Sequence, residues 1–294
     1  MKPPPPSNTS YIGRFAPSPS GPLHFGSLVT AVASYLHARQ QQGQWQVRID
    51  DLDPPRAVPG ATEAILECLH QHGLHADGPV QYQSNNNADY ESALQQLMAA
   101  EQAFQCPCSR RDLEKTQGRH QRPCRPAQPD LEKVWRFDSE NWLITFDDHL
   151  QGRQSEALAG LSGDFVLKRR DGVFAYQLAV VVDDAALGVS DIVRGIDLMH
   201  ATPRQIALQQ ALGLQSPRYY HLPVICHDDG EKLSKGSGAP AVQGDPCQNL
   251  RGVLRHLGLE PPLDLNTASQ LLDWAQNAWR IDTLRHSEHI PLTV

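Results

Sequence analysis

Residues 11–72 alternate between strand-like and helix-like patterns, which restricts the chain to a small set of folds. A short buried strand is expected over residues 11–15, and apolar side chains recur at helical spacing over residues 27–42. Residues 45–49 alternate like a second strand, and residues 62–72 carry the apolar face of a second helix. Because this order favours a parallel sheet with right-handed crossovers, we expect an α/β fold.

Both expected strands end in segments that suit a binding site. The prolines of residues 16–22 make a rigid loop after the first strand. The second strand runs into residues 50–53, which carry three carboxylates. Since ligands of open α/β sheets bind at the carboxyl ends of the strands, we expect the site at this edge.

The regular patterns are interrupted in the middle of the chain. Residues 106–163 are polar, rich in arginine and glutamine, and lack long apolar periodicity, as expected for an insertion or a small second domain. Beyond them, residues 164–168, 176–182 and 220–225 are expected to form buried strands. Residues 202–212 are expected to form a helix whose first threonine is the N-cap, followed by a proline and a capping-box glutamine.

Length and composition narrow the class of protein. A chain of 294 residues, 40% of them hydrophobic, can build one large domain with insertions or two domains. No apolar run reaches the roughly 18 residues that span a bilayer, so no membrane contact is expected. Residues 1–10 lack a secretory signal and are rich in proline, which predicts a disordered tail and a cytoplasmic location. The net charge of −7 argues against general nucleic-acid binding but allows a local basic patch.

Two segments are suited to a polyphosphate. His24 and Gly26 stand at the start of the first helix, where free N–H groups and the positive end of the dipole attract anions. Lys232 and Lys235 lie in a glycine-bearing loop and suit the charge that develops during phosphate transfer. The alternatives are a proline-stiffened turn with a surface histidine and a merely solvated lysine loop.

A cysteine cluster suggests a metal site. Cys106, Cys108, His120 and Cys124 supply three thiolates and an imidazole, the four-ligand set that tetrahedral zinc prefers. A closed set of four protein ligands indicates one structural zinc rather than a catalytic one. The alternative is a group of reduced cysteines without a metal, beside an exposed histidine.

Several of these segments resemble class I aminoacyl-tRNA synthetases. Residues 24–27 are similar to the HIGH signature without its last histidine, and residues 232–236 to the KMSKS signature with leucine and glycine substituted. Four further segments resemble, in order, the catalytic domain of the glutamyl-tRNA synthetases across roughly residues 11–240: residues 14–21, 47–53, 176–184 and 192–195.

This resemblance implies a Rossmann-type catalytic domain with an inserted zinc-bearing subdomain. About 56 residues follow Gly238, too few for the anticodon-binding region of a discriminating glutamyl-tRNA synthetase. Together with the cysteines, this resembles the truncated paralogues that modify queuosine in tRNA(Asp). The expected domains are a disordered tail at 1–10, the catalytic domain at 11–105 and 164–240, the inserted zinc-binding and acceptor subdomain at 106–163, and a helical C-terminal segment at 241–294.

The resemblance implies ATP-dependent activation of glutamate, with Mg²⁺, to glutamyl-adenylate. Glutamate is then transferred to the queuosine base in the anticodon of tRNA(Asp). Residues 106–125 hold six Arg or Lys against two Asp or Glu, a basic patch that binds tRNA phosphate or is merely solvated. No obligate protein partner is expected. The alternatives are a minimal glutamyl-tRNA synthetase that charges tRNA(Glu) and a catalytically dead, zinc-stabilised RNA-binding protein.

The resemblance also assigns residues to roles. Catalysis falls to His24, Lys232 and Lys235, and ATP binding to His24, Gly26 and Lys235. Glutamate binding falls to Arg14, Phe15, Ala16, Pro17, Ser18, Asp50, Tyr176 and Arg194. Each of the two arginines suits a carboxylate through its bidentate fork. For Arg194 the alternative is a structural ion pair, for instance with Asp197.

Two positions depart from the family pattern. Asp50 replaces the usual glutamate, which shortens the reach of the carboxylate by roughly 1.5 Å. Either a water intervenes, or the loop shifts, or the neighbouring Asp51 takes the role. His120 stands where the family has a tyrosine. It is therefore the least certain of the four expected ligands.

Overall fold

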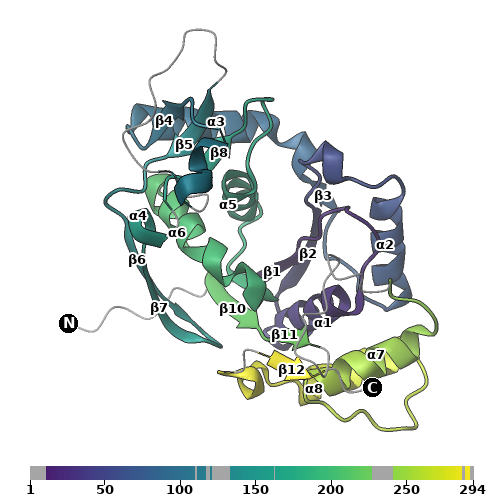
Figure 1. Ribbon diagram of the computed structural model, residues 1–294. Coiled ribbons are helices and arrows are strands. Elements are labelled where there is room, and N and C mark those ends of the chain that lie inside the picture. Colours follow the sequence, from purple (N-terminus) through teal and green to yellow (C-terminus); the bar gives the residue numbers. More distant parts are fainter. Residues whose placement is uncertain are drawn as a thin grey trace.

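A five-stranded parallel sheet forms the centre of the computed structural model, which describes residues 11–109, 111–116, 120, 133–161, 163–226, 241–286 and 289–291 (Figure 1). All neighbouring strands of this sheet are parallel. Across the sheet the order is β10 (Arg218–Leu222), β9 (Asp191–Gly195), β1 (Ile12–Phe15), β2 (Gln44–Ile49) and β3 (Gln81–Tyr82). The expected α/β class is confirmed.

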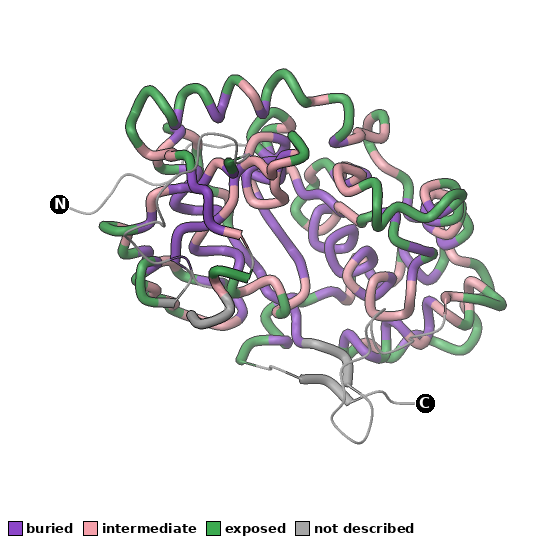
Figure 2. The backbone as a smooth tube through the Cα atoms, turned by 45° about the horizontal axis from the view of Figure 1, so that its top comes forward, coloured by how far each residue is buried: buried purple, intermediate pink, exposed green. Residues whose placement is uncertain are grey.

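Helices cover both faces of the sheet and enclose two cores. One core joins the sheet to α1 (Phe25–Gln40), α2 (Ala61–Gln71), α7 (Pro246–His256) and α8 (Ala268–Ala278). The other joins the opposite face to α3 (Asn87–Ala99), α5 (Tyr176–Ala186) and α6 (Thr202–Ala211). Buried residues run through the strands and the inner sides of these helices (Figure 2).

Three expectations about secondary structure are wrong. Residues 176–182 form the start of helix α5 rather than a strand, because a continuous apolar run also suits a helix buried on nearly all sides. Ala201, not Thr202, is the N-cap of α6, and the Thr202 hydroxyl is used elsewhere. The strand expected over residues 220–225 is divided into β10 and β11 (Val224–Cys226) on either side of Pro223.

The polar middle of the chain contains two small antiparallel sheets. The first consists of β4 (Ala103–Cys106), β5 (Val134–Phe137) and β8 (Val166–Lys168). The second is the hairpin of β6 (Leu143–Asp148) and β7 (Gly152–Ala157), which packs on β10 and α6. This segment therefore reaches the edge of the central sheet.

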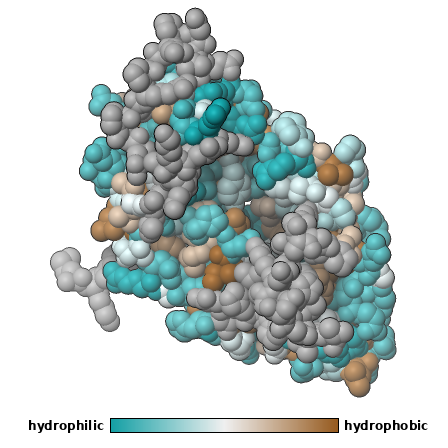
Figure 3. All heavy atoms as spheres, viewed as in Figure 1, coloured by the Kyte–Doolittle hydropathy of each residue, from teal (hydrophilic) through white to brown (hydrophobic). Residues whose placement is uncertain are grey.

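Short elements complete the fold. They are η1 (Pro54–Arg56), η2 (Gln83–Asn85), η3 (Arg111–Thr116), α4 (Leu158–Leu161), η4 (Ile196–Ala201), η6 (Ile281–Leu284) and β12 (His289–Pro291), which pairs with β11. Hydrophilic side chains dominate the described residues of the face in Figure 3, with hydrophobic ones scattered among them. Among the helices of the described residues, none has the length and hydrophobicity needed to span a membrane.

Candidate active site and metal cluster

A row of polar side chains crosses the sheet near its carboxyl edge. His221, Arg194, Arg14 and Arg48 are each the penultimate residue of a strand, on β10, β9, β1 and β2 respectively. The strand registers place all four on the same face, the one that α5 covers. Every one of them is buried. Since buried charges require partners, this row defines the site.

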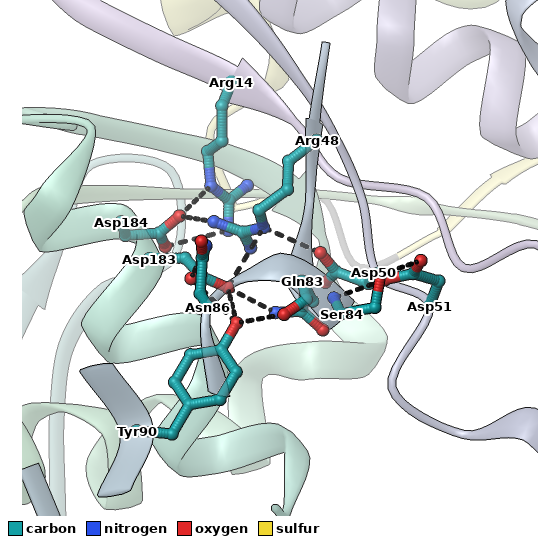
Figure 4. Close-up of polar contacts among 10 residues, drawn as sticks. All are labelled: Arg14, Arg48, Asp50, Asp51, Gln83, Ser84, Asn86, Tyr90, Asp183 and Asp184. Atoms are coloured by element: carbon teal, nitrogen blue, oxygen red, sulfur yellow. Dashed lines mark hydrogen bonds and ion pairs between the residues drawn. The ribbon is translucent and has the colours of Figure 1, made fainter. Parts of the chain in front are cut away.

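Asp184 on α5 joins two of these arginines (Figure 4). Arg14 donates from Nε to Asp184 Oδ1 at 3.1 Å, and Arg48 donates from Nη1 to the same oxygen at 2.6 Å. Arg48 also donates from Nε to Asp50 Oδ1 at 2.7 Å. The four side chains thus form one chain of ion pairs from β1 to the end of β2.

Asp183, the neighbour of Asp184, anchors the same helix to α3. Its carboxylate accepts hydrogen bonds from Gln83 at 2.7 Å, Asn86 at 2.8 Å and Tyr90 at 2.8 Å (Figure 4). Arg48 Nε lies 3.8 Å from it. These contacts fix the height of α5 over the sheet, and so the position of Asp184.

The carboxylates of the cluster differ in acidity. Burial alone would raise the pKa of Asp184, but the guanidinium groups of Arg14 and Arg48 outweigh it and hold that pKa below its usual value. Burial raises the pKa of Asp50, and Arg48 offsets only part of this effect. Two guanidinium groups face three carboxylates when Asp183 is included, which leaves an excess of negative charge beside Asp50.

A cavity of about 580 Å³ opens beside this cluster. Three of the residues expected to bind glutamate line it, namely Ser18, Asp50 and Tyr176. Arg14 and Arg194 are not among its lining residues. Arg136, Arg169 and Arg170 also line it, and Arg169 is paired there with Asp53 and Asp171.

Arg194 is held on one side only. Its Nε donates to His221 Nε2 at 3.0 Å and its Nη2 donates to Thr202 Oγ1 at 2.8 Å. The buried Nη1 has no hydrogen-bond partner within the described part of the chain. Among the described residues, Arg194 is held by His221 and Thr202 and forms no ion pair with Asp197.

The other residues expected at the glutamate site have different environments. Phe15 points into the core on the opposite face and stacks on Trp45, so its side chain faces away from the cavity. Pro17 accepts a hydrogen bond from the Asp50 amide at 3.0 Å through its carbonyl oxygen. Ala16 lies between them at intermediate burial. The rigid loop therefore fixes the backbone of Asp50.

Asp51 is engaged outside the cavity. Its carboxylate accepts from the Ser84 amide at 2.8 Å and from the Ser84 hydroxyl at 2.7 Å (Figure 4). Asp50, by contrast, lines the cavity. Of the two carboxylates, Asp50 is the one placed to meet a ligand there.

His24 is the N-cap of α1, as the sequence indicates. Ser27 donates from its amide to His24 Nδ1 at 3.3 Å, and Ser27 Oγ lies 3.0 Å from His24 Nε2. Gly26 follows in the first turn. Ala241 forms a bridge with His24, so the chain returns to this helix end directly after residues 227–240. Lys232 and Lys235 lie in that segment, outside the described residues.

The structure brings three of the four expected metal ligands together. The ligand atoms of Cys106, Cys108 and His120 all lie within 4.8 Å of one another. His120 Nε2 is 3.1 Å from Cys106 Sγ, while its Nδ1 lies 2.8 Å from Asp164 Oδ2. The cluster is buried and could hold a metal ion. Cys124 lies outside the described residues.

Comparison with known proteins identifies the family. Residues 12–140 and 127–264 match the family described as "tRNA synthetases class I (E and Q), catalytic domain". The glutamyl-Q tRNA(Asp) synthetase of Ectopseudomonas mendocina is 48% identical over 276 residues, covering 92% of this chain and 94% of that protein. The chain belongs to the glutamyl-Q tRNA(Asp) synthetase family. Another member of this family, from Xanthomonas campestris, is 51% identical over 257 residues, or 87% of this chain and 86% of its own length.

Solved structures agree on the fold. A glutamate tRNA ligase from Elizabethkingia meningosepticum, crystallised with its amino acid, has a TM-score of 0.81 at 23% identity and covers 97% of this chain and 67% of its own. A glutamate-tRNA synthetase from Elizabethkingia anophelis gives the same TM-score. The chain thus has the class I synthetase catalytic fold, as its resemblance to this family implied.

Proposed function

We propose that this chain activates glutamate with ATP and transfers it to the queuosine base of tRNA(Asp), acting in the cytoplasm where its tRNA lies. Membership of the family supports this reaction. The observation that carries it is the placing of two buried arginines, Arg14 and Arg194, on neighbouring strands, with Arg14 joined through Asp184 and Arg48 to Asp50, which lines the cavity. This charge pattern matches the two carboxylates and one ammonium group of glutamate.

Each charge of glutamate has a partner in this arrangement. Arg194 offers one carboxylate its Nη1, which has no partner among the described residues, and Arg14 meets the other. Asp50 faces the ammonium group, which the excess negative charge of the cluster also attracts. Ser18 and Tyr176 line the same cavity and supply hydroxyl groups. The pocket therefore favours a short, dicarboxylic amino acid.

Activation joins glutamate to AMP. An oxygen of the α-carboxylate attacks the α-phosphate of ATP, a mixed anhydride forms, and the bond to the β-phosphate breaks to release pyrophosphate. His24 at the start of α1, together with Lys232 and Lys235, stabilises the charge on the leaving group. Mg²⁺, bound to ATP, adds to this charge neutralisation when present. No protein nucleophile takes part.

Transfer needs room for the acceptor next to the adenylate. A hydroxyl group of the queuosine ring attacks the anhydride carbonyl, and AMP leaves with the electron pair. Arg136 and Arg170, which also line the cavity, suit a nucleotide that carries phosphates. Positioning supplies most of the rate, because both reactants are held in one cavity.

A structural zinc ion at Cys106, Cys108 and His120, with Cys124 as the fourth ligand, completes the proposal. The ligand atoms of the three described residues are close enough to share one ion. Two thiolates and an imidazole form a borderline-soft set that suits zinc. When bound, the ion would tie His120 to the end of β4 and to Cys108, which lines the cavity.

Glutamate-dependent exchange of pyrophosphate into ATP tests the activation step. We expect exchange with the unsubstituted chain and its loss with Lys235→Glu, because charge reversal repels the leaving group. Lys133→Glu, at an exposed lysine outside the site, is the matched control and keeps the exchange. Exchange that survives Lys235→Glu would contradict the role of this loop. Absence of exchange with the unsubstituted chain would contradict activation itself.

A further inference from the structure

Arg194 is supported by a second pair of buried residues that the proposed reaction does not use. His221 Nε2 lies 3.0 Å from Arg194 Nε, and His221 Nδ1 lies 2.6 Å from Asp148 Oδ2. The side chains of His221 and Asp148 are completely buried. A line of three side chains therefore runs from the β6–β7 hairpin through β10 to β9.

The chemistry of the guanidinium fixes the protonation of this line. Arg194 Nε can only donate, so His221 Nε2 must accept with its lone pair. The proton of the neutral ring then lies on Nδ1 and is donated to Asp148. Burial and the nearby Arg194 lower the pKa of His221, which favours the neutral ring. Asp148 thus selects the tautomer that can hold Arg194.

Asp148 is itself held firmly at the end of β6. Its Oδ1 accepts from the amides of Leu150 at 3.0 Å and Gln151 at 2.8 Å. Burial alone would raise its pKa, but the hydrogen bond from His221 and these amides outweigh burial and lower it, so the carboxylate stays ionised. The hairpin is fastened to β10 by the amide of His149, which donates to the Tyr219 carbonyl at 2.9 Å.

The guanidinium is fixed at two of its three nitrogens. His221 accepts from Nε, and Thr202 Oγ1 accepts from Nη2 at 2.8 Å. The Tyr219 ring lies under the guanidinium carbon at 5.3 Å. Only Nη1 has no partner among the described residues. The support therefore leaves one direction for an anion, and it removes the entropy cost of ordering Arg194 when the anion binds.

We propose that Asp148 and His221 are positioning residues, which orient Arg194 toward a carboxylate of glutamate. This role rests on the proposed function, because it takes glutamate as the ligand of Arg194. This role extends the site to the β6–β7 hairpin. Asp148, at the end of β6, acts on glutamate only through His221 and Arg194. The affinity for glutamate, but not for ATP, then depends on this hairpin.

Steady-state pyrophosphate exchange with four variants tests the role. His221→Phe fills the volume but removes the acceptor, and we expect the KM for glutamate to rise about tenfold to a hundredfold, as for a lost hydrogen bond to a charged group. Asp148→Asn removes the carboxylate that keeps the proton of His221 on Nδ1, and we expect it to raise the KM for glutamate as well. His221→Gln restores an acceptor for Arg194 and keeps the KM within about threefold of the unsubstituted value. The KM for ATP stays unchanged throughout.

The fourth variant is a control from the same hairpin. His149→Phe keeps the ring that stacks on Tyr220 and does not alter the line to Arg194, so its KM for glutamate stays normal. An equal rise of both KM values, or a His221→Gln variant as impaired as His221→Phe, would overturn the positioning role. If His221→Phe does not fold, the Asp148→Asn and His221→Gln results decide in the same way.

Failure of the proposed function has a different signature. Arg194→Lys should raise the KM for glutamate at least as much as His221→Phe, because a lysine ammonium group cannot reproduce the planar guanidinium that His221 and Thr202 hold. A normal KM in Arg194→Lys would contradict glutamate as its ligand, and with it this inference. A raised KM in Arg194→Lys with normal values in the Asp148 and His221 variants would overturn the positioning role alone.

Discussion

Arg14 and Arg48, from neighbouring strands of the sheet, bind the same carboxylate. Asp184 Oδ1 lies 3.1 Å from Arg14 Nε and 2.6 Å from Arg48 Nη1. Arg48 also binds Asp50, which lines the cavity. Arg48, which is fully buried, therefore connects Asp50 to Arg14 through Asp184, and both of these residues are assigned to the substrate. Loss of Arg48 should affect stability and binding together.

Arg48→Met should destabilise the fold strongly. The substitution leaves Asp50 and Asp184 buried with fewer positive partners, and removing one member of a buried ion pair costs about 3–5 kcal/mol. Arg285→Met is the control, because Arg285 pairs with Asp282 at an exposed position and its loss costs at most about 1 kcal/mol. Urea unfolding measures both. Equal midpoints for the two variants would show that the buried network contributes nothing.

Asp50→Asn should weaken glutamate binding. The amide carries no charge for the ammonium group, and we expect a rise in the KM for glutamate of about tenfold to a hundredfold with little change for ATP. Asp51→Asn is the matched control, since Asp51 binds Ser84 away from the cavity. Pyrophosphate exchange gives both values. The opposite pattern, with only Asp51→Asn impaired, would assign the ammonium group to Asp51.

Cys106→Ser should release the metal ion. A hydroxyl is a poor substitute for a thiolate, so we expect zinc affinity to fall at least about a hundredfold. Elemental analysis of purified protein should give about one zinc per chain, and none with the variant. Cys247→Ser, at a cysteine remote from the cluster in sequence, keeps the ion. A chain purified without any metal, and unaffected by a chelator, would contradict the site.

His37 should make stability dependent on pH. It packs edge-on against Tyr11 and Tyr220 on the inner side of α1, and burial lowers its pKa to about 4. The unfolded chain takes up this proton near pH 6.5 while the folded one does not until about pH 4. The free energy of unfolding therefore falls as the pH drops through this window, by about 3 kcal/mol in total.

His37→Phe removes this titration but keeps an aromatic ring against both tyrosines. The variant should lose about 3 kcal/mol less than the unsubstituted chain between pH 6.5 and pH 4. Urea unfolding across this range measures the difference. Parallel curves for the two proteins would show that His37 is not the group responsible.

The first half of the sheet could be predicted because the signals that begin and end its strands and helices are local in the sequence. Prolines fix the loop after β1, and the spacing of apolar residues identifies α1 and α2. Residues 176–182 defeated the same reasoning, since a fully buried helix shows no polar face. Their helical state is decided by contacts with α3 and α6, which no local pattern contains.

Ser18, Asp50 and Tyr176, which line the cavity, could be named from the sequence, but the network of ion pairs could not. Arg48 and His221 each stand alone among apolar neighbours in a buried strand, and this pattern already indicates a charge with a distant partner. Which partner it is depends on strand register and on α5, which brings Asp184 into contact with Arg48 although it stands 136 residues later in the sequence. The roles of all the site residues, among them Lys232, Lys235 and Cys124, and the domain boundaries stay predictions.

The most direct test of the central claim is transfer of labelled glutamate to purified tRNA. Two samples of tRNA(Asp) are compared, one with queuosine at the wobble position and one with unmodified guanine, with tRNA(Glu) alongside. We predict label on the queuosine-containing sample only. The account would be contradicted by label on tRNA(Glu), or by equal label on tRNA(Asp) with and without queuosine.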